Sequence, residues 1–143
     1  MGNYQDLVFY QKARQVTKAI DLLVKSWPRT MQTQEISRQL FRSATSVGAN
    51  IAEGHGRHQG TEYVHYLIIA QGSANETEHW LHTAQDCGLG SSEKIDEILK
   101  TNNEVLRMIT SAISTIRSKQ GTKNFREDNS EYLVDDNLNN NDQ

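Results

Sequence analysis

Glutamate and histidine residues recur at a spacing that can bind a transition metal. The five histidines lie within residues 55–82, and two of them form Glu-x-x-His pairs, Glu62 with His65 and Glu76 with His79. In di-iron helix bundles such pairs come from different helices that face one core. Here both pairs lie in one predicted helix, 14 residues and therefore about 21 Å apart. They cannot share a metal ion, and we expect neither a metal site nor another cofactor.

The single cysteine, Cys87, is a possible nucleophile, with His55 or His82 as its base. It lies at the C-terminal end of a predicted helix, where the helix dipole disfavours a thiolate. We therefore expect Cys87 to serve in packing. Since no nucleophile, base and orienting group occur together, the sequence predicts a protein that is not an enzyme and has no small-molecule substrate.

A glycine-rich stretch, Gly54-His55-Gly56-Arg57 followed by Gly60, is a second candidate for ligand binding. Glycines let backbone amides approach a phosphate, but the spacing matches neither G-x-G-x-x-G nor a P-loop. The glycines also follow a helical pattern, whereas nucleotide-binding loops follow a strand. The stretch favours a helix–helix connection in which Gly54 takes the left-handed conformation after the helix end.

The charges are unevenly distributed along the chain. Six of the 18 acidic residues and no basic residue lie within 127–143, so residues 1–126 carry 15 basic and 12 acidic residues. Basic side chains on neighbouring helices can bind the phosphates of a nucleic acid, with an affinity that falls as salt rises. The candidates for phosphate contact are Arg14, Lys18, Arg38, Arg42 and Arg57.

Four amphipathic segments must position these residues. Apolar side chains recur every three or four residues, which is typical of helices with one buried face. The predicted buried positions are, from the first helix to the fourth, Phe9, Ala13, Val16, Ile20, Leu23 and Trp27; Ile36, Leu40, Ala44, Val47 and Ile51; Tyr63, Leu67, Ala70, Ala74, Thr77, Leu81 and Ala84; and Ile95, Ile98, Leu106, Ile109, Ile113 and Ile116. Trp27-Pro28 ends the first helix, the second opens near Thr33, the third near Thr61, and Ser91 or Ser92 caps the fourth.

Helices of this length joined by short connections must pack as antiparallel neighbours. The sequence therefore predicts an all-α protein, an up-down-up-down four-helix bundle over residues 1–120. Residues 121–143 are predicted to form a disordered acidic tail, because they are too polar to bury enough surface. A Tyr132-Leu133-Val134 patch in this tail could dock on a partner or on a basic face of the bundle.

The second helix carries a recognisable motif. The segment 39–57 resembles the Q-x-x-R-A-x-x-S-(I/V)-x-x-N-I-A-E-G-x-x-R signature of bacterial four-helix-bundle proteins, with Phe41 where many members have a second arginine and Ser43 where alanine is usual. Segments 6–13 and 70–76 resemble the first and third helices of the same family. The resemblance covers residues 4–119, and the acidic tail is not part of it.

This family includes proteins encoded in intervening sequences of 23S ribosomal RNA genes, and it is similar to the accessory variability determinant (Avd) proteins of diversity-generating retroelements. The resemblance implies a non-catalytic, nucleic-acid-associated accessory protein. It also implies a ring-shaped homopentamer and, as partners, a reverse transcriptase and its template RNA. Apolar residues outside the predicted core fit such an oligomer, namely Phe41, Ile68, Ile69 and Trp80.

The signature residues also have a structural interpretation. Asn50 and Glu53 could hydrogen-bond the interhelical turn, Gly54 could end the helix, and Ser46 could permit close packing. An oligomeric scaffold that binds another protein without nucleic acid is the alternative function.

The sequence predicts a cytoplasmic protein without a membrane contact. It has one cysteine, no apolar run of about 20 residues and no secretory pattern at residues 1–6.

Overall fold

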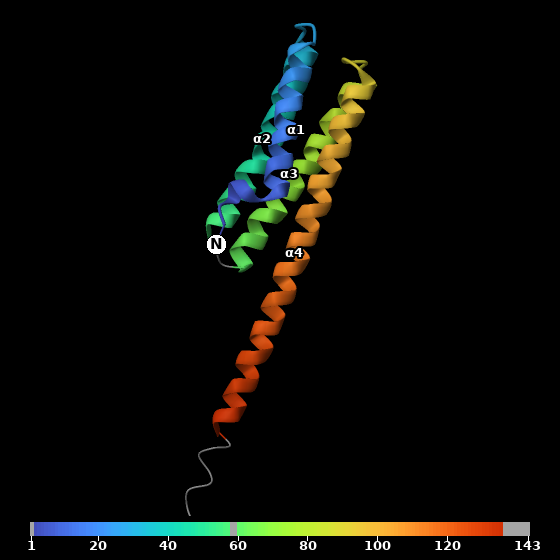
Figure 1. Ribbon diagram of the computed structural model, residues 1–143. Helices are drawn as coiled ribbons and strands as arrows, with labels where there is room; N and C mark the ends of the chain where they lie inside the picture. The colour runs from blue at the N-terminus through green and yellow to red at the C-terminus, as the bar shows by residue number, and fades with distance from the viewer. Residues whose placement is uncertain (1, 58–59, 136–143) are drawn as a thin grey trace, which may run out of the picture.

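A computed structural model describes residues 2–57 and 60–135 of the chain, with side chains up to residue 124. A short 3-10 helix, η1 (Tyr4–Asp6), precedes four α-helices, α1 (Val8–Lys25), α2 (Met31–Arg57), α3 (Gly60–Asp86) and α4 (Ser92–Asp135). The described residues contain no strand. The helices run up, down, up and down, and each packs on its neighbour in the chain while α4 also packs on α1 (Figure 1). The predicted fold class is confirmed.

The helix ends follow from local capping. At the start of α2 the Thr33 amide donates to Thr30 Oγ1 at 3.2 Å, and the Thr30 amide donates to Thr33 Oγ1 at 2.9 Å. This reciprocal pair satisfies two free amides, as in a capping box, and α2 begins at Met31, two residues before the predicted start. Ser91 caps α4 as predicted, since its hydroxyl accepts the Lys94 amide at 3.4 Å.

The core consists of two apolar clusters along the bundle axis. One surrounds Trp27, Ile36 and Ile95, near the α1–α2 and α3–α4 connections. The other surrounds Ile51, Val64 and Ile113, near the α2–α3 connection. The predicted buried positions are buried, apart from four that pack against the clusters while partly exposed, namely Phe9, Tyr63, Leu106 and Ile116.

Buried polar groups lie along the inner faces of α2, α3 and α4. Thr77 Oγ1 donates to Ser43 Oγ at 3.0 Å, and both residues are fully buried. Asn102 is 2% exposed and donates from Nδ2 to the Ala74 carbonyl at 3.0 Å. Satisfied polar groups of this kind cost little to bury, whereas unpaired ones are expensive. They fix which residues of neighbouring helices face one another.

Gly54 does not end its helix, which corrects the sequence prediction. It is buried within α2, which continues to Arg57, and the described glycines with positive φ are Gly88 and Gly90, in the α3–α4 connection. A Cβ atom on Gly54 would lie 2.8 Å from Tyr66 Cβ and 2.9 Å from Tyr63 Cδ2. Glycine is required here because α2 and α3 approach closely.

Helix α4 is longer than the sequence predicted. It continues through Asp135, so residues 121–135 of the predicted tail are helical, while 136–143 lie outside the described residues. In Figure 1 this part of α4 extends beyond the other three helices. The stretch lacks proline, and Lys123 and Glu127 stand four residues apart, a spacing that supports a helix. Within the described chain no helix has the length and apolarity that crossing a membrane requires.

Candidate nucleic-acid interface

A surface groove separates α1 from α2. Its volume is about 810 Å³, and Tyr10, Arg14 and Lys18 line it from α1 while Phe41 and Thr45 line it from α2. Small residues, Gly48 and Ala49, complete the α2 side. Because these side chains are short, the two helices leave an open trough between them instead of filling it.

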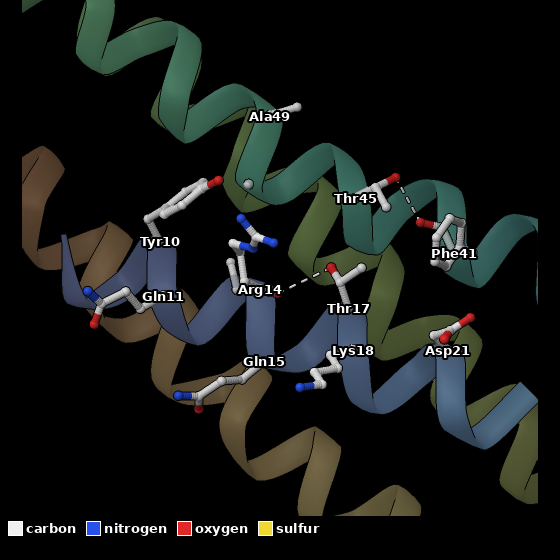
Figure 2. Close-up of a pocket in the computed structure, with 12 residues that line it drawn as sticks. Tyr10, Gln11, Arg14, Gln15, Thr17, Lys18, Asp21, Phe41, Thr45 and Ala49 are labelled. Carbon is white, nitrogen blue, oxygen red and sulfur yellow. Dashed lines mark hydrogen bonds between the residues drawn. The ribbon is translucent and has the colours of Figure 1, made fainter. Parts of the chain in front are cut away.

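Two predicted phosphate contacts, Arg14 and Lys18, lie in this groove. Both side chains are exposed, and the Arg14 side chain extends toward α2 beside Tyr10, whereas Lys18 lies at the outer edge of α1 (Figure 2). Neither cation has a salt-bridge partner among the side chains that the structure describes. The acidic residue of the groove, Asp21, pairs with Lys25 at 2.7 Å. The groove therefore presents two positive charges that no carboxylate of the described residues neutralises.

The other three predicted contacts lie elsewhere on α2, and each has a carboxylate partner. Arg38 Nη2 donates to Glu35 Oε1 at 2.8 Å. Arg57 Nη2 donates to Glu53 Oε1 at 2.6 Å.

Arg42 pairs with Glu76 of α3, so it ties α2 to α3. The five residues that the sequence proposed do not form one patch, because Arg42 and Arg57 contact residues of α3, whereas Arg14 and Lys18 line the groove between α1 and α2.

Ion pairs shift the pKa of three groups among the described residues. Hydrogen bonds from Gln39 and then Arg38 lower the pKa of Glu35. The hydrogen bond to Glu53 raises the pKa of Arg57. On α1, the Lys12 ammonium donates to Glu104 of α4 at 2.7 Å and lowers the pKa of that carboxyl. Glu35 and Glu104 therefore remain charged at neutral pH, and their cationic partners are less available to a phosphate.

Three of the four signature residues, Ser46, Asn50 and Gly54, serve the contact between α2 and α3. Asn50 Nδ2 donates to the Ser46 carbonyl at 2.8 Å and to Ser46 Oγ at 3.0 Å. Ser46 Oγ in turn lies 2.9 Å from Ser73 Oγ of α3. Asn50 thus orients the hydroxyl that joins the helices, while Glu53 holds Arg57. The interhelical turn that these two residues were predicted to bond comprises residues 58–59, which lie outside the described residues.

The metal and nucleophile candidates have other surroundings. Glu76 accepts from Arg42 and from Trp80 Nε1, the latter at 3.3 Å. Within the described residues no three potential metal ligands come together. Cys87 is exposed just after the end of α3, which corrects the prediction that it serves in packing.

Three apolar side chains predicted for an oligomer interface are exposed. Phe41 and Ile68 are each 44% exposed and Ile69 is 39% exposed. Ile68 and Ile69 belong to α3, whereas Phe41 lines the groove. Trp80, the fourth, is partly buried against the core, so it offers less apolar surface to such an interface than the other three.

The groove itself was not predicted, although a signal for it exists in the sequence. Phe41, Thr45 and Gly48 follow one another at intervals of four and three residues, so they share a stripe of α2 beside the core stripe. Two of them are small and none is charged. A stripe of this kind that faces Arg14 and Lys18 indicates an open contact surface. It can be recognised only when α1 is known to be the neighbour of α2 on this side.

Two comparisons place the chain among known proteins. Residues 5–111 match the sequence profile of the family described as 23S rRNA-intervening sequence protein. The fold is similar to the crystal structure of a protein with unknown function from the S23 ribosomal protein family of Bacteroides thetaiotaomicron, with a TM-score of 0.64 and 28% sequence identity. That match covers 74% of this chain and 98% of the other. A search of curated proteins found no match.

Proposed function

Because the chain belongs to the 23S rRNA-intervening sequence protein family, we propose that it is a non-catalytic cytoplasmic accessory protein that binds RNA through the groove between α1 and α2. Arg14 and Lys18 contact phosphates in this account, and Tyr10 and Phe41 offer aromatic faces beside them. Aromatic side chains next to cations are the chemistry that single-stranded RNA favours, because bases can stack where phosphates are bound.

The observation that carries the proposal is the charge state of the groove. Arg38, Arg42 and Arg57 already contact carboxylates, so a phosphate must compete for them. Arg14 and Lys18 have no such competitor among the described residues. A polyanion therefore gains more electrostatic attraction at the groove than at Arg38, Arg42 or Arg57.

One groove with two cations binds RNA weakly, and we propose that the protein assembles into an oligomer that presents several grooves. Exposed Ile68 and Ile69 on α3 supply apolar surface for such an assembly. Several grooves on one RNA raise the overall affinity through effective concentration. The family resemblance supports a ring of five copies with a reverse transcriptase as a further partner, and light scattering of the purified protein measures the number of copies.

The test is a titration of the full chain, at low salt, with a structured RNA that contains single-stranded loops. The double variant Arg14→Gln/Lys18→Gln is expected to bind roughly tenfold more weakly, because each exposed ion pair contributes up to about 1 kcal/mol. The matched control is Lys25→Gln/Arg38→Gln, which removes the same charge from two cations that already have carboxylate partners. Equal losses in the two variants would contradict the assignment of RNA binding to the groove.

The exposed isoleucines favour a second candidate function, a scaffold that binds another protein through α3. Ile68 and Ile69 are adjacent apolar residues on an outer face, and such surface often marks a protein interface. Recovery of a protein partner after nuclease treatment, and its loss in Ile69→Asp, would support the scaffold. A partner that is released by nuclease would support the RNA account instead.

A further inference from the structure

The C-terminal part of the chain has the chemistry of a ligand for the groove. Residues 127–142 contain six acidic residues and no basic residue. Nine residues of this segment, 127–135, belong to α4. In a helix, Phe125, Tyr132 and Leu133 recur at intervals of seven and eight, so they share one stripe. The acidic positions Glu127, Asp128, Glu131 and Asp135 form the adjoining stripe by the same spacing.

The geometry of α4 keeps this segment away from the groove of its own chain. Gln120 still reaches α3, where its Nε2 donates to Thr61 Oγ1 at 3.1 Å. Beyond that point α4 extends past the end of the bundle (Figure 1), and the 15 residues from Gln120 to Asp135 carry it about 22 Å outward.

The groove lies in the opposite direction from this extension, inside the bundle. Gly48 lies nine residues before the end of α2, or about 13 Å inside the bundle. The eight residues after Asp135 span at most about 29 Å when extended, which is less than the roughly 35 Å between Asp135 and the groove along the axis. The acidic segment can therefore meet a groove on a second copy of the chain but not its own.

Charge and apolarity match between the two surfaces. The groove offers two cations without carboxylate partners among the described residues, together with the exposed ring of Phe41. The sequence of the segment combines acidic residues with Tyr132 and Leu133. Recognition of an amphipathic helix in a groove needs this combination, apolar anchors with charges of opposite sign at their side.

We propose that the acidic segment 127–142 of one copy occupies the α1/α2 groove of another copy, where its carboxylates pair with Arg14 and Lys18. The segment then acts as a mimic of a polyanion and limits the access of RNA to the groove. The docking stands on the observations above, whereas the competition with RNA rests on the proposed function.

Zero-length carbodiimide coupling of the full chain tests the docking, since it links an amine to a carboxylate in direct contact. An equal mixture of isotope-labelled and unlabelled protein is coupled and analysed by mass spectrometry. We expect Lys18 to be linked to acids of 127–142 in peptides that combine a labelled and an unlabelled half. Lys25 serves as the internal control, because it belongs to the same helix and pairs with Asp21.

Two variants test whether the Lys18 links depend on the cations of the groove. Arg14→Gln keeps the Lys18 amine but is expected to reduce the Lys18 links by roughly two- to fivefold, because one ion pair is lost. Arg38→Gln removes a cation that does not line the groove and already pairs with Glu35, and it is expected to leave them unchanged. Absence of Lys18 links to the segment, or links only within one chain, would overturn the proposal.

Addition of RNA separates this inference from the proposed function. If the links form and RNA reduces them, both are supported. If the links form but RNA neither binds nor reduces them, the proposed function fails while the docking stands. If RNA binds the groove in the titration but no links form, the docking fails alone.

Discussion

Replacing Leu67 with alanine is expected to lower the free energy of unfolding by about 2–5 kcal/mol, because the substitution leaves a cavity in a core that cannot fully collapse. Leu67 is 0% exposed and belongs to the cluster that joins all four helices near the α2–α3 connection. Denaturant unfolding followed by circular dichroism measures the change.

The adjacent residue gives a control on the same helix. Ile68 is 44% exposed, and Ile68→Ala is expected to change the free energy of unfolding by no more than about 0.5 kcal/mol at a protein concentration where the chain is monomeric. Comparable losses at the two positions would contradict the assignment of Leu67 to the core and of Ile68 to the outer face.

Gly54→Ala is expected to destabilise the protein by roughly 1–2 kcal/mol, although alanine is the better helix former. The new Cβ would lie 2.8 Å from Tyr66 Cβ and 3.3 Å from the Tyr63 carbonyl oxygen, so α3 or the tyrosines must move. Overpacking of this kind costs about 1–3 kcal/mol, and the gain in helix propensity offsets up to about 1 kcal/mol of it.

Gly72→Ala is the matched control for Gly54→Ala. Gly72 also lies within a helix, α3, and a Cβ there meets no atom within 4 Å. It is expected to raise the free energy of unfolding by about 0.5–1 kcal/mol, because only the propensity and the entropy of the unfolded chain change. Thermal unfolding of both variants reports the opposite signs. Stabilisation by both substitutions would show that α2 and α3 do not approach closely at Gly54.

The buried faces of the helices could be predicted because a helix repeats every 3.6 residues and its apolar stripe must turn inward. Ile20, Leu40 and Ile109 follow that pattern and are 0% exposed. On α4 the pattern missed Asn102 and Val105, which occupy the same stripe between Ile98 and Leu106. Asn102 interrupts the apolar pattern of α4 in the sequence. It can be buried only because it bonds the Ala74 carbonyl of another helix.

Features that depend on the distance between helices could not be predicted. A glycine at the end of an apolar stripe fits a helix end as well as a close approach, and only the position of Tyr63 and Tyr66 shows that Gly54 serves the second. The sequence likewise suggested five phosphate contacts of equal standing. The Glu35–Arg38 spacing of three residues could have indicated a neutralised cation. The Arg42–Glu76 pair joins positions 34 residues apart, so only the packing of α2 on α3 reveals it.

The salt dependence of RNA binding reports whether Arg14 and Lys18 bind phosphates, because it counts the phosphates that cations contact. A plot of log affinity against log salt is expected to be linear with a negative slope for the wild-type chain. In Arg14→Gln/Lys18→Gln the slope is expected to become less negative by about 1.4–1.8 for each groove engaged, since each lost contact changes it by about 0.7–0.9. An unchanged slope in this variant would contradict the assignment of phosphate binding to the groove between α1 and α2.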